Sequence, residues 1–235
     1  MPRTWGWRAL VIATVLVVFG NVAGIAGGPN VVTVSWAAIA QSAGTVLIVI
    51  LASRWCGLTW AEAGIGRTNL LRSSLIGAGI GLGLAAVVLL ALEVGAQLGT
   101  PITYQPVRGA SISAVLSHAL VGLPLQTAIP EELAFRGLLL GLLVRELTPL
   151  RATLVTSAIF VAWHLVVQVQ TLAVTNFTSP WLIVPAMGLA FAGLFAGGVI
   201  FALLRLGTRN LAAAVMAHWL FDAGLITGLF FLTRS

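Results

Sequence analysis

Three short polar clusters lie in a chain that is otherwise almost entirely apolar. The first is "EELAFR", Glu131 to Arg136. The second is "FVAWH", which ends at His164, and the third is "HWLFD", His218 to Asp222. Carboxyl and imidazole groups are the side chains that most often act as general acids and bases, and both can bind zinc. The clusters hold three of the chain's six acidic residues and two of its three histidines, so chemistry is expected there.

The spacing within the first cluster gives its two glutamates different neighbours. Residues four apart share a helix face, so Glu132 and Arg136 can form an ion pair. Glu131 points about 140° away from Arg136 at 100° per residue. We therefore predict a structural role for Glu132 and Arg136 and an unpaired carboxyl group for Glu131. Pro130 is expected to break or kink the helix, because proline removes a helical hydrogen bond.

The other two clusters each place a histidine on a helix face shared with a residue four positions away. These pairs are Phe160 with His164 and His218 with Asp222. Each cluster lies 13 or 14 residues from an arginine at the predicted cytoplasmic end of its helix, or about 20 Å, which places all three clusters near mid-membrane. The distances join Glu131 and Arg145, His164 and Arg151, and Asp222 and Arg209. His118 lies about 20 Å from Glu131 on a roughly opposite face, so we predict a structural role for it.

The composition indicates an all-α, multi-pass protein of the cell membrane. Of 235 residues, 59% are hydrophobic and only 8% are charged, whereas about a quarter of the residues in soluble domains are charged. Apolar runs of about 20 residues are long enough to cross the bilayer core as helices. About seven spans are expected. They are 9–27, 33–52, 74–97, 112–144 with an interruption, 152–173, 181–203 and 211–232.

The twelve arginines predict the orientation of these spans. With the N-terminus in the cytoplasm, nine arginines fall on the cytoplasmic side and two on the other, which is the usual positive-inside bias. The nine are Arg3, Arg8, Arg54, Arg67, Arg72, Arg145, Arg151, Arg205 and Arg209, and the two are Arg108 and Arg234. Net charge +6 can indicate nucleic-acid binding. These arginines lie in separate loops, so we expect the lipid bilayer as their partner and no nucleic acid.

The chain is expected to form one membrane-embedded unit with two parts. Residues 1–56 are predicted to be a transmembrane hairpin, and residues 57–235 are predicted to be the core that carries the three clusters. The first span resembles a secretory signal peptide, with Arg3 and Arg8 before an apolar run and small residues after it. That run is long for a signal peptide, so we expect a retained helix.

Glycines four residues apart are expected to let helices pack closely. Small residues at this spacing allow helix backbones to approach each other in membranes. The pairs are Gly77/Gly81, Gly79/Gly83 and Gly193/Gly197. The run "GAGIGLG" that contains the first four lies within a span and follows no strand, so we do not interpret it as a nucleotide-binding loop.

The three clusters, in this order on separate membrane helices, resemble the motifs EExxxR, FxxxH and HxxxN/D of the CPBP family. This family contains CAAX prenyl proteases, bacteriocin-processing proteins and Abi-type proteins. The loop "GLTWAEAGIGR" before the third span is also similar to the beginning of the family's domain. The resemblance covers residues 57–230. It implies an intramembrane, glutamate-dependent endopeptidase that acts on a membrane-associated peptide or protein.

The resemblance also implies a role for each site residue. Glu131 would be the general base that activates a water, assisted by His164. His218 and Asp222 would stabilise the oxyanion of the tetrahedral intermediate. Supporting residues would be Glu132, Arg136 and Phe160. The prenyl-protease branch has Asn where this chain has Asp222, and an ionised carboxylate cannot donate a hydrogen bond. Asp222 must therefore be protonated or orient His218.

Three alternatives remain at this stage. The same carboxyl and imidazole groups could bind zinc in a metalloprotease, although no helix carries an HExxH pair, and our expectation is a site with no metal or other cofactor. Membrane chains of Glu, His and Asp also serve transporters, but no inverted repeat is visible. A non-catalytic immunity or scaffolding protein is the third alternative.

Overall fold

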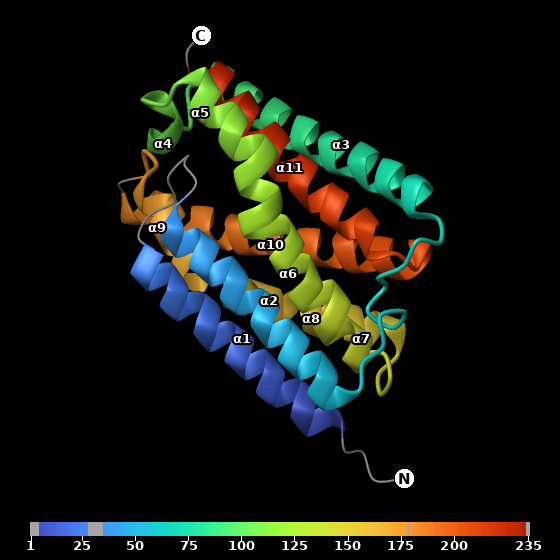
Figure 1. Ribbon diagram of the computed structural model, residues 1–235. Coiled ribbons are helices and arrows are strands. Elements are labelled where there is room, and N and C mark those ends of the chain that lie inside the picture. Colours follow the sequence, from blue (N-terminus) through green and yellow to red (C-terminus); the bar gives the residue numbers. More distant parts are fainter. Residues whose placement is uncertain (1–4, 28–34, 178, 234–235) are drawn as a thin grey trace.

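The computed structural model describes residues 5–27, 35–177 and 179–233, which are mainly helical (Figure 1). The membrane-sized helices are α1 (Trp5–Gly27), α2 (Trp36–Cys56), α3 (Leu70–Gln97), α10 (Pro180–Thr208) and α11 (Leu211–Leu232). Helix α1 packs beside α2, and α3 packs beside α11. A long helix between these pairs comprises α5 (Ile112–Ser117), η1 (His118–Gly122), η2 (Pro124–Ala128), α6 (Ile129–Glu132), η3 (Leu133–Leu139) and α7 (Leu140–Leu143). The remaining helices are α4 (Gln105–Arg108), α8 (Pro149–Trp163) and α9 (Leu165–Ala173).

These helices confirm the predicted all-α, multi-pass membrane protein. Six are long and apolar enough to cross a membrane, and the bent pair α8 and α9 together would make seven. Arg3, Arg234 and the start of the expected span 33–52 lie outside the described residues. Helix packing does not tell which end faces the cytoplasm. The orientation and the division at residue 56 therefore stay predictions.

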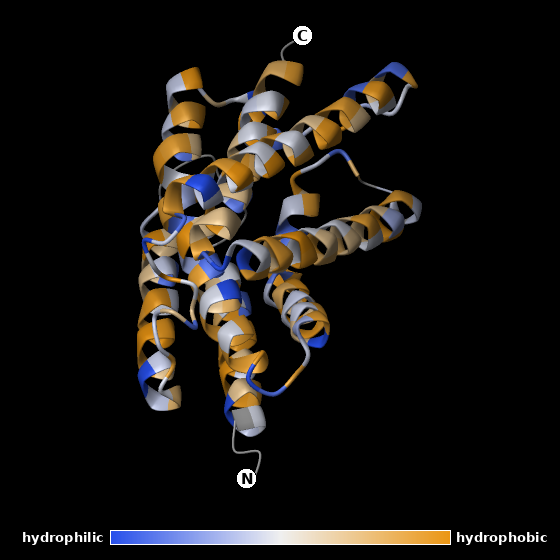
Figure 2. Ribbon diagram, turned by 90° about the vertical axis from the view of Figure 1, so that its right-hand side faces the viewer, coloured by the Kyte–Doolittle hydropathy of each residue, from blue (hydrophilic) through white to orange (hydrophobic). Residues whose placement is uncertain are grey.

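The outer surface of the bundle is suited to lipid. Many large apolar side chains on the spans are exposed, including Leu82, Val184 and Leu189. Figure 2 shows apolar residues along most of the helix lengths and hydrophilic residues in the connecting loops. In water such a surface would be unfavourable, because large contiguous apolar patches are rare on soluble monomers. In a bilayer these side chains contact acyl chains.

Of the two outcomes expected at Pro130, a break or a kink, the break does not occur, because the long helix continues through this proline. Wide π turns, which join residues five apart, occur on both sides of it, in η2 and η3. Proline has no N–H, so in a regular helix the carbonyl oxygen of Gln126 would lose its partner. The Ser42 hydroxyl of α2 lies 2.8 Å from that oxygen and 2.9 Å from the carbonyl oxygen of Ala38, so its one hydrogen can be directed at either. A neighbouring helix can thus supply the hydrogen bond that proline removes.

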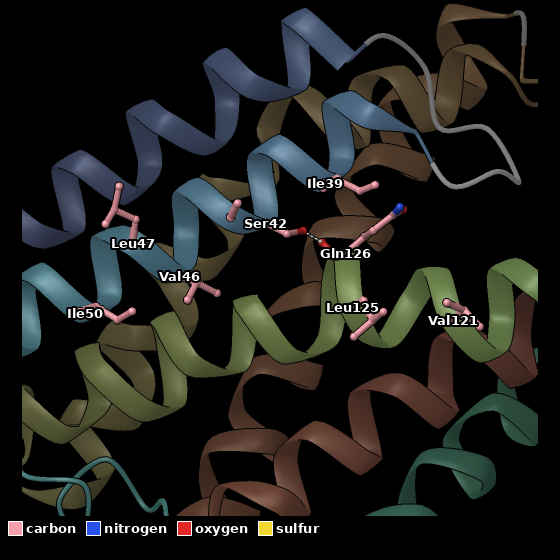
Figure 3. A pocket seen from close by; sticks show the side chains of 9 residues that line it. Ile39, Ser42, Val46, Leu47, Ile50, Val121, Leu125 and Gln126 are labelled. Carbon is pink, nitrogen blue, oxygen red and sulfur yellow. Dashed lines mark hydrogen bonds between the residues drawn. The ribbon is translucent and has the colours of Figure 1, made fainter.

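A groove lies beside this contact, between helix α2 and the long helix (Figure 3). The groove has a volume of about 580 Å³. Apolar side chains line both walls, among them Val46 and Ile50 from α2 and Val121 and Leu125 from the long helix. It is therefore an apolar recess within the membrane-spanning part of the fold.

The expected span 152–173 is not one continuous helix. It is divided into α8 and α9, which meet at His164 with a bend of 50°. No proline or glycine lies near this position, so the usual sequence indications of a kink are missing. The bend places the second polar cluster at the end of α8.

Only part of the glycine prediction is confirmed. Gly77 and Gly81 of α3 lie directly against the backbone carbonyl groups of Ala213 and Ala217 in α11, where any Cβ atom would overlap them. The other predicted glycines, Gly79, Gly83, Gly193 and Gly197, face open space among the described residues. One small-residue face of α3 therefore fixes α11, the helix that carries the third polar cluster.

Hydrogen bonds join the loop 57–69 to the ends of three helices. Both oxygens of Glu62 accept hydrogen bonds from the guanidinium group of Arg145, at 2.9 and 2.8 Å. Arg205 of α10 donates to the backbone carbonyl of Glu62, and Asn210, before α11, donates to two further carbonyls of the loop. The Arg145 hydrogen bonds lower the pKa of the Glu62 carboxyl group to about 2. This loop thus joins the end of the long helix to α10 and α11, and so connects two of the three helices that carry polar clusters.

We expect Glu62→Gln to lower the free energy of unfolding at pH 7 by about 1 kcal/mol, because the pair is partly exposed. The folded-state pKa is lowered from 4.5 to about 2. The stabilisation is therefore complete above pH 4.5 and is lost as the pH falls through about 2. Thermal unfolding in detergent at several pH values measures this difference. Glu93→Gln is the control, because among the described residues the Glu93 carboxyl group bonds only Gln97 of its own helix. A difference that does not shrink in acid would contradict the prediction.

Candidate active site

The structure brings the three polar clusters together in the interior of the bundle. Glu131 and Glu132 come from α6, His164 from the junction of α8 and α9, and His218 and Asp222 from α11. Four of these side chains are buried, and Asp222 is partly exposed. The depths estimated from the arginine spacing therefore agree with the observed arrangement.

Glu131 faces His164 across a short gap. Glu131 Oε2 lies 3.5 Å from His164 Nε2, and both residues are less than 10% exposed. The other ring nitrogen, Nδ1, lies 2.9 Å from the carbonyl oxygen of Phe160. That oxygen can only accept, so Nδ1 carries a hydrogen. When His164 is neutral, its Nε2 is therefore an acceptor that faces Glu131, so a direct hydrogen bond between them needs a proton on the Glu131 carboxyl group.

Glu132 and Arg136 form the predicted ion pair. Arg136 Nη1 donates to Glu132 Oε1 at 2.9 Å, and both side chains are fully buried. The guanidinium carbon also lies 4.2 Å from the centre of the Phe160 ring, a favourable cation–π geometry. Gly198 provides space here, because a Cβ atom at this position would lie 3.3 Å from Arg136 Nη2. The pair anchors α6 within the bundle.

Glu132 has a second partner that the helix-face argument does not predict. His218 Nδ1 donates to the same Glu132 oxygen at 2.9 Å. The imidazole stacks on Phe201 of α10, with ring centres 5.2 Å apart. Phe201 carries no sequence indication, since it is one apolar residue among many in α10. Glu132 therefore links Arg136 to His218 and sets the orientation of the imidazole.

Asp222 completes the arrangement from the next turn of α11. Its Oδ2 lies 3.3 Å from His218 Nε2. Because Nδ1 already donates to Glu132, this contact requires one more proton, either on Asp222 or on His218. An oxyanion would need His218 Nε2–H as its donor. In this structure the Asp222 carboxyl group lies where the oxyanion would have to bind. The predicted roles of these two residues stay predictions.

The cluster can be electrically neutral inside the membrane. It contains three carboxyl groups, Glu131, Glu132 and Asp222, and three basic groups, Arg136, His164 and His218. An unbalanced buried charge would be strongly unfavourable, whereas paired charges offset much of the desolvation penalty. Protons can therefore move among these groups without changing the total charge of the site.

His118 lies on the long helix outside these contacts. Its ring folds against Gly122 of the same helix, and Nδ1 has no hydrogen-bond partner within the described ranges. Its predicted structural role stays a prediction.

The arrangement does not form an evident metal site. Among the described residues, no three His, Cys, Asp or Glu side chains are grouped so that they could hold one ion. Zinc usually binds three or four such ligands at about 2 Å. Here Glu132 is occupied by Arg136 and His218, which leaves its oxygen poorly suited to zinc. Cleavage rates with and without a chelator would measure the metal dependence of the protein.

The fold and the cluster together define a multi-pass helical membrane protein with a buried carboxyl–imidazole site. Residues 111–224 match the family described as type II CAAX prenyl endopeptidase Rce1-like. This match confirms the CPBP family that the three motifs indicate, and all three lie inside the matched residues. At the level of the family, the match and the helical membrane fold support an intramembrane protease of the CAAX type. No curated protein and no solved structure matches the chain.

Proposed function

We propose that this protein hydrolyses a peptide bond of a membrane-associated substrate with a water activated by Glu131 and His164. The observation that carries the proposal is the buried contact of 3.5 Å between Glu131 Oε2 and His164 Nε2, in a segment that matches a peptidase family. A general base must lie within hydrogen-bond reach of the proton that it takes, and a water beside this contact would be within reach of both side chains.

The reaction would proceed by direct attack of water on the peptide carbonyl carbon. Glu131 takes one proton from the water, and the resulting hydroxide forms the new C–O bond. The carbonyl oxygen becomes an oxyanion. With the additional proton on His218 rather than on Asp222, His218 Nε2–H stabilises this oxyanion after Asp222 moves off the nitrogen. A hydrogen bond directed at a developing oxyanion is often a large contribution to such catalysis. The proton held by Glu131 and His164 then passes to the leaving amine as the C–N bond breaks.

The family name points to a prenylated C-a-a-X sequence as the substrate, in which the cysteine carries the lipid. The proposal is tested with purified protein in detergent and two peptides that end in this sequence, one farnesylated and one not. Mass spectrometry identifies the products. We expect cleavage of the farnesylated peptide. If neither peptide is cleaved, the proposed activity on C-a-a-X sequences is wrong.

Asp222→Asn is expected to retain activity or increase it. The amide supplies a donor beside His218 without needing a protonated carboxyl group. If Glu131 and His164 alone activate the water, a chelator should change the cleavage rate of neither wild type nor variant. A zinc enzyme would behave in the opposite way, because asparagine is a poor zinc ligand and chelation removes the metal. Cleavage rates with and without chelator, together with elemental analysis, distinguish the two. Activity lost on chelation and restored by zinc would contradict the glutamate mechanism.

A further inference from the structure

The break between α8 and α9 separates two backbone groups that a regular helix would join by a hydrogen bond. In an α-helix the N–H of Val166 would donate to the carbonyl oxygen of Ala162, four residues earlier. Here the side chain of Asn21, from α1, lies between them. Its Nδ2 donates to the Ala162 oxygen at 2.9 Å, and its Oδ1 accepts from the Val166 nitrogen at 2.9 Å. One carboxamide thus replaces one helical hydrogen bond and satisfies both groups.

This insertion explains a bend that the local sequence does not. Sharp kinks arise at proline, at glycine or serine pairs, at π turns, or where a side chain enters the hydrogen-bond ladder of the helix. Of these causes, only the last is present at His164, where the bend is 50°. An unpaired backbone group within a membrane would cost several kcal/mol in hydrocarbon, so the opened helix needs such a partner.

Two glycines of α1 allow Asn21 to reach this position. Gly20 lies against the indole ring of Trp163, and a Cβ atom there would overlap that ring. Gly24, one turn further along α1, lies close to Val166, where a Cβ atom would be 3.3 Å from its side chain. Small residues on both sides of Asn21 therefore allow α1 to approach the break closely enough for a short side chain to reach it.

The break determines how His164 is held. The His164 N–H donates to Val161 at 3.0 Å, three residues earlier, instead of to Phe160. The carbonyl oxygen of Phe160 is then available to the His164 imidazole, whose Nδ1 bonds it at 2.9 Å. This contact leaves Nε2 facing Glu131. The direction of the imidazole is therefore a consequence of the opened helix.

We propose that Asn21 is a positioning residue of the active site. Its carboxamide holds the α8–α9 junction open and thereby keeps His164 Nε2 directed at Glu131. The effect on catalysis rests on the proposed function, because only there is His164 given its assisting role. Asn21 lies outside residues 111–224, so α1 adds a part of the site that the family match does not include.

The proposal is tested by NMR of the ¹⁵N-labelled imidazole groups in detergent micelles, without any substrate. The chain has three histidines, and His164→Gln assigns the signal of interest. In the wild type, we expect neutral His164 to show the single tautomer with hydrogen on Nδ1. In Asn21→Ala, we expect this single tautomer to be lost, because the junction no longer holds the ring. In the peptide assay, kcat should fall on the order of 100-fold with little change in KM, since a misplaced catalytic group has effects of this size.

Gln170→Ala is the matched control, because Gln170 also joins α9 to α1, through the carbonyl of Gly24, but lies beyond the break. It should leave the His164 tautomer unchanged. If Asn21→Ala does not fold, Asn21→Asp serves instead, since it keeps the acceptor for Val166 and loses the donor to Ala162. An unchanged tautomer in the Asn21 variant, or an equal change in Gln170→Ala, would overturn the proposal. A changed tautomer in a protein that cleaves neither peptide would support the positioning role and reject the proposed activity.

Discussion

Glu131→Gln is expected to reduce peptide cleavage by at least about 100-fold while leaving the protein folded, because general-base catalysis commonly contributes factors of 10² to 10⁴. The amide has almost the same shape as the carboxyl group but cannot take a proton from water. Glu131 Oε2 accepts no hydrogen bond within the described part of the chain, so the substitution removes few stabilising contacts. Rates measured on the farnesylated peptide, beside thermal unfolding in detergent, give both quantities.

The control for this prediction is His118→Gln, because His118 makes no hydrogen bond to the site in the described ranges and is not part of the proposed reaction. Its activity should stay near that of the wild type. Full activity in Glu131→Gln would show that the base is assigned to the wrong residue. Loss of folding in Glu131→Gln would instead show that Glu131 has a structural role, contrary to the helix-face argument.

The sequence predicts well those features that depend on one helix at a time. The positions of the spans follow from the length of the apolar runs. The Glu132–Arg136 pair follows from the spacing of four residues. The common depth of Glu131 and His164 follows from the rise per residue in two helices that begin near arginines. None of these inferences requires knowledge of how the helices are arranged around each other.

Features that depend on contacts between helices were missed or wrongly predicted. Pro130 indicated a break, but a hydroxyl group from α2 and wide π turns accommodate it. His164 gave no indication of a break, because its cause is Asn21, more than 140 residues away in the sequence. The link from Glu132 to His218 likewise joins two distant segments. Helix periodicity cannot predict such contacts, since it describes only the neighbours along one helix.

A second large effect is expected at Glu132, which contacts Arg136 in its own helix and His218 in α11. Its carboxyl group is fully buried and accepts from both Arg136 and His218. Glu132→Gln leaves Arg136 as a buried cation without its counter-charge, and removing one member of a buried pair typically costs about 3–5 kcal/mol. We therefore expect a large loss in the free energy of unfolding, and lower activity as a consequence of the misplaced His218.

Comparison with two further variants makes this prediction specific. Glu131→Gln changes the adjacent residue in the same chemical way, yet should unfold close to the wild-type temperature. The double variant Glu132→Gln with Arg136→Gln removes both charges, so it should recover part of the lost stability, because replacing a whole buried pair is often nearly neutral. Its activity should stay low, since His218 Nδ1 still lacks a carboxylate partner. Unfolding in detergent, monitored by circular dichroism, compares the three. Equal stability of Glu132→Gln and Glu131→Gln would mean that the pair does not hold the site together, and Arg136 would then need another counter-charge.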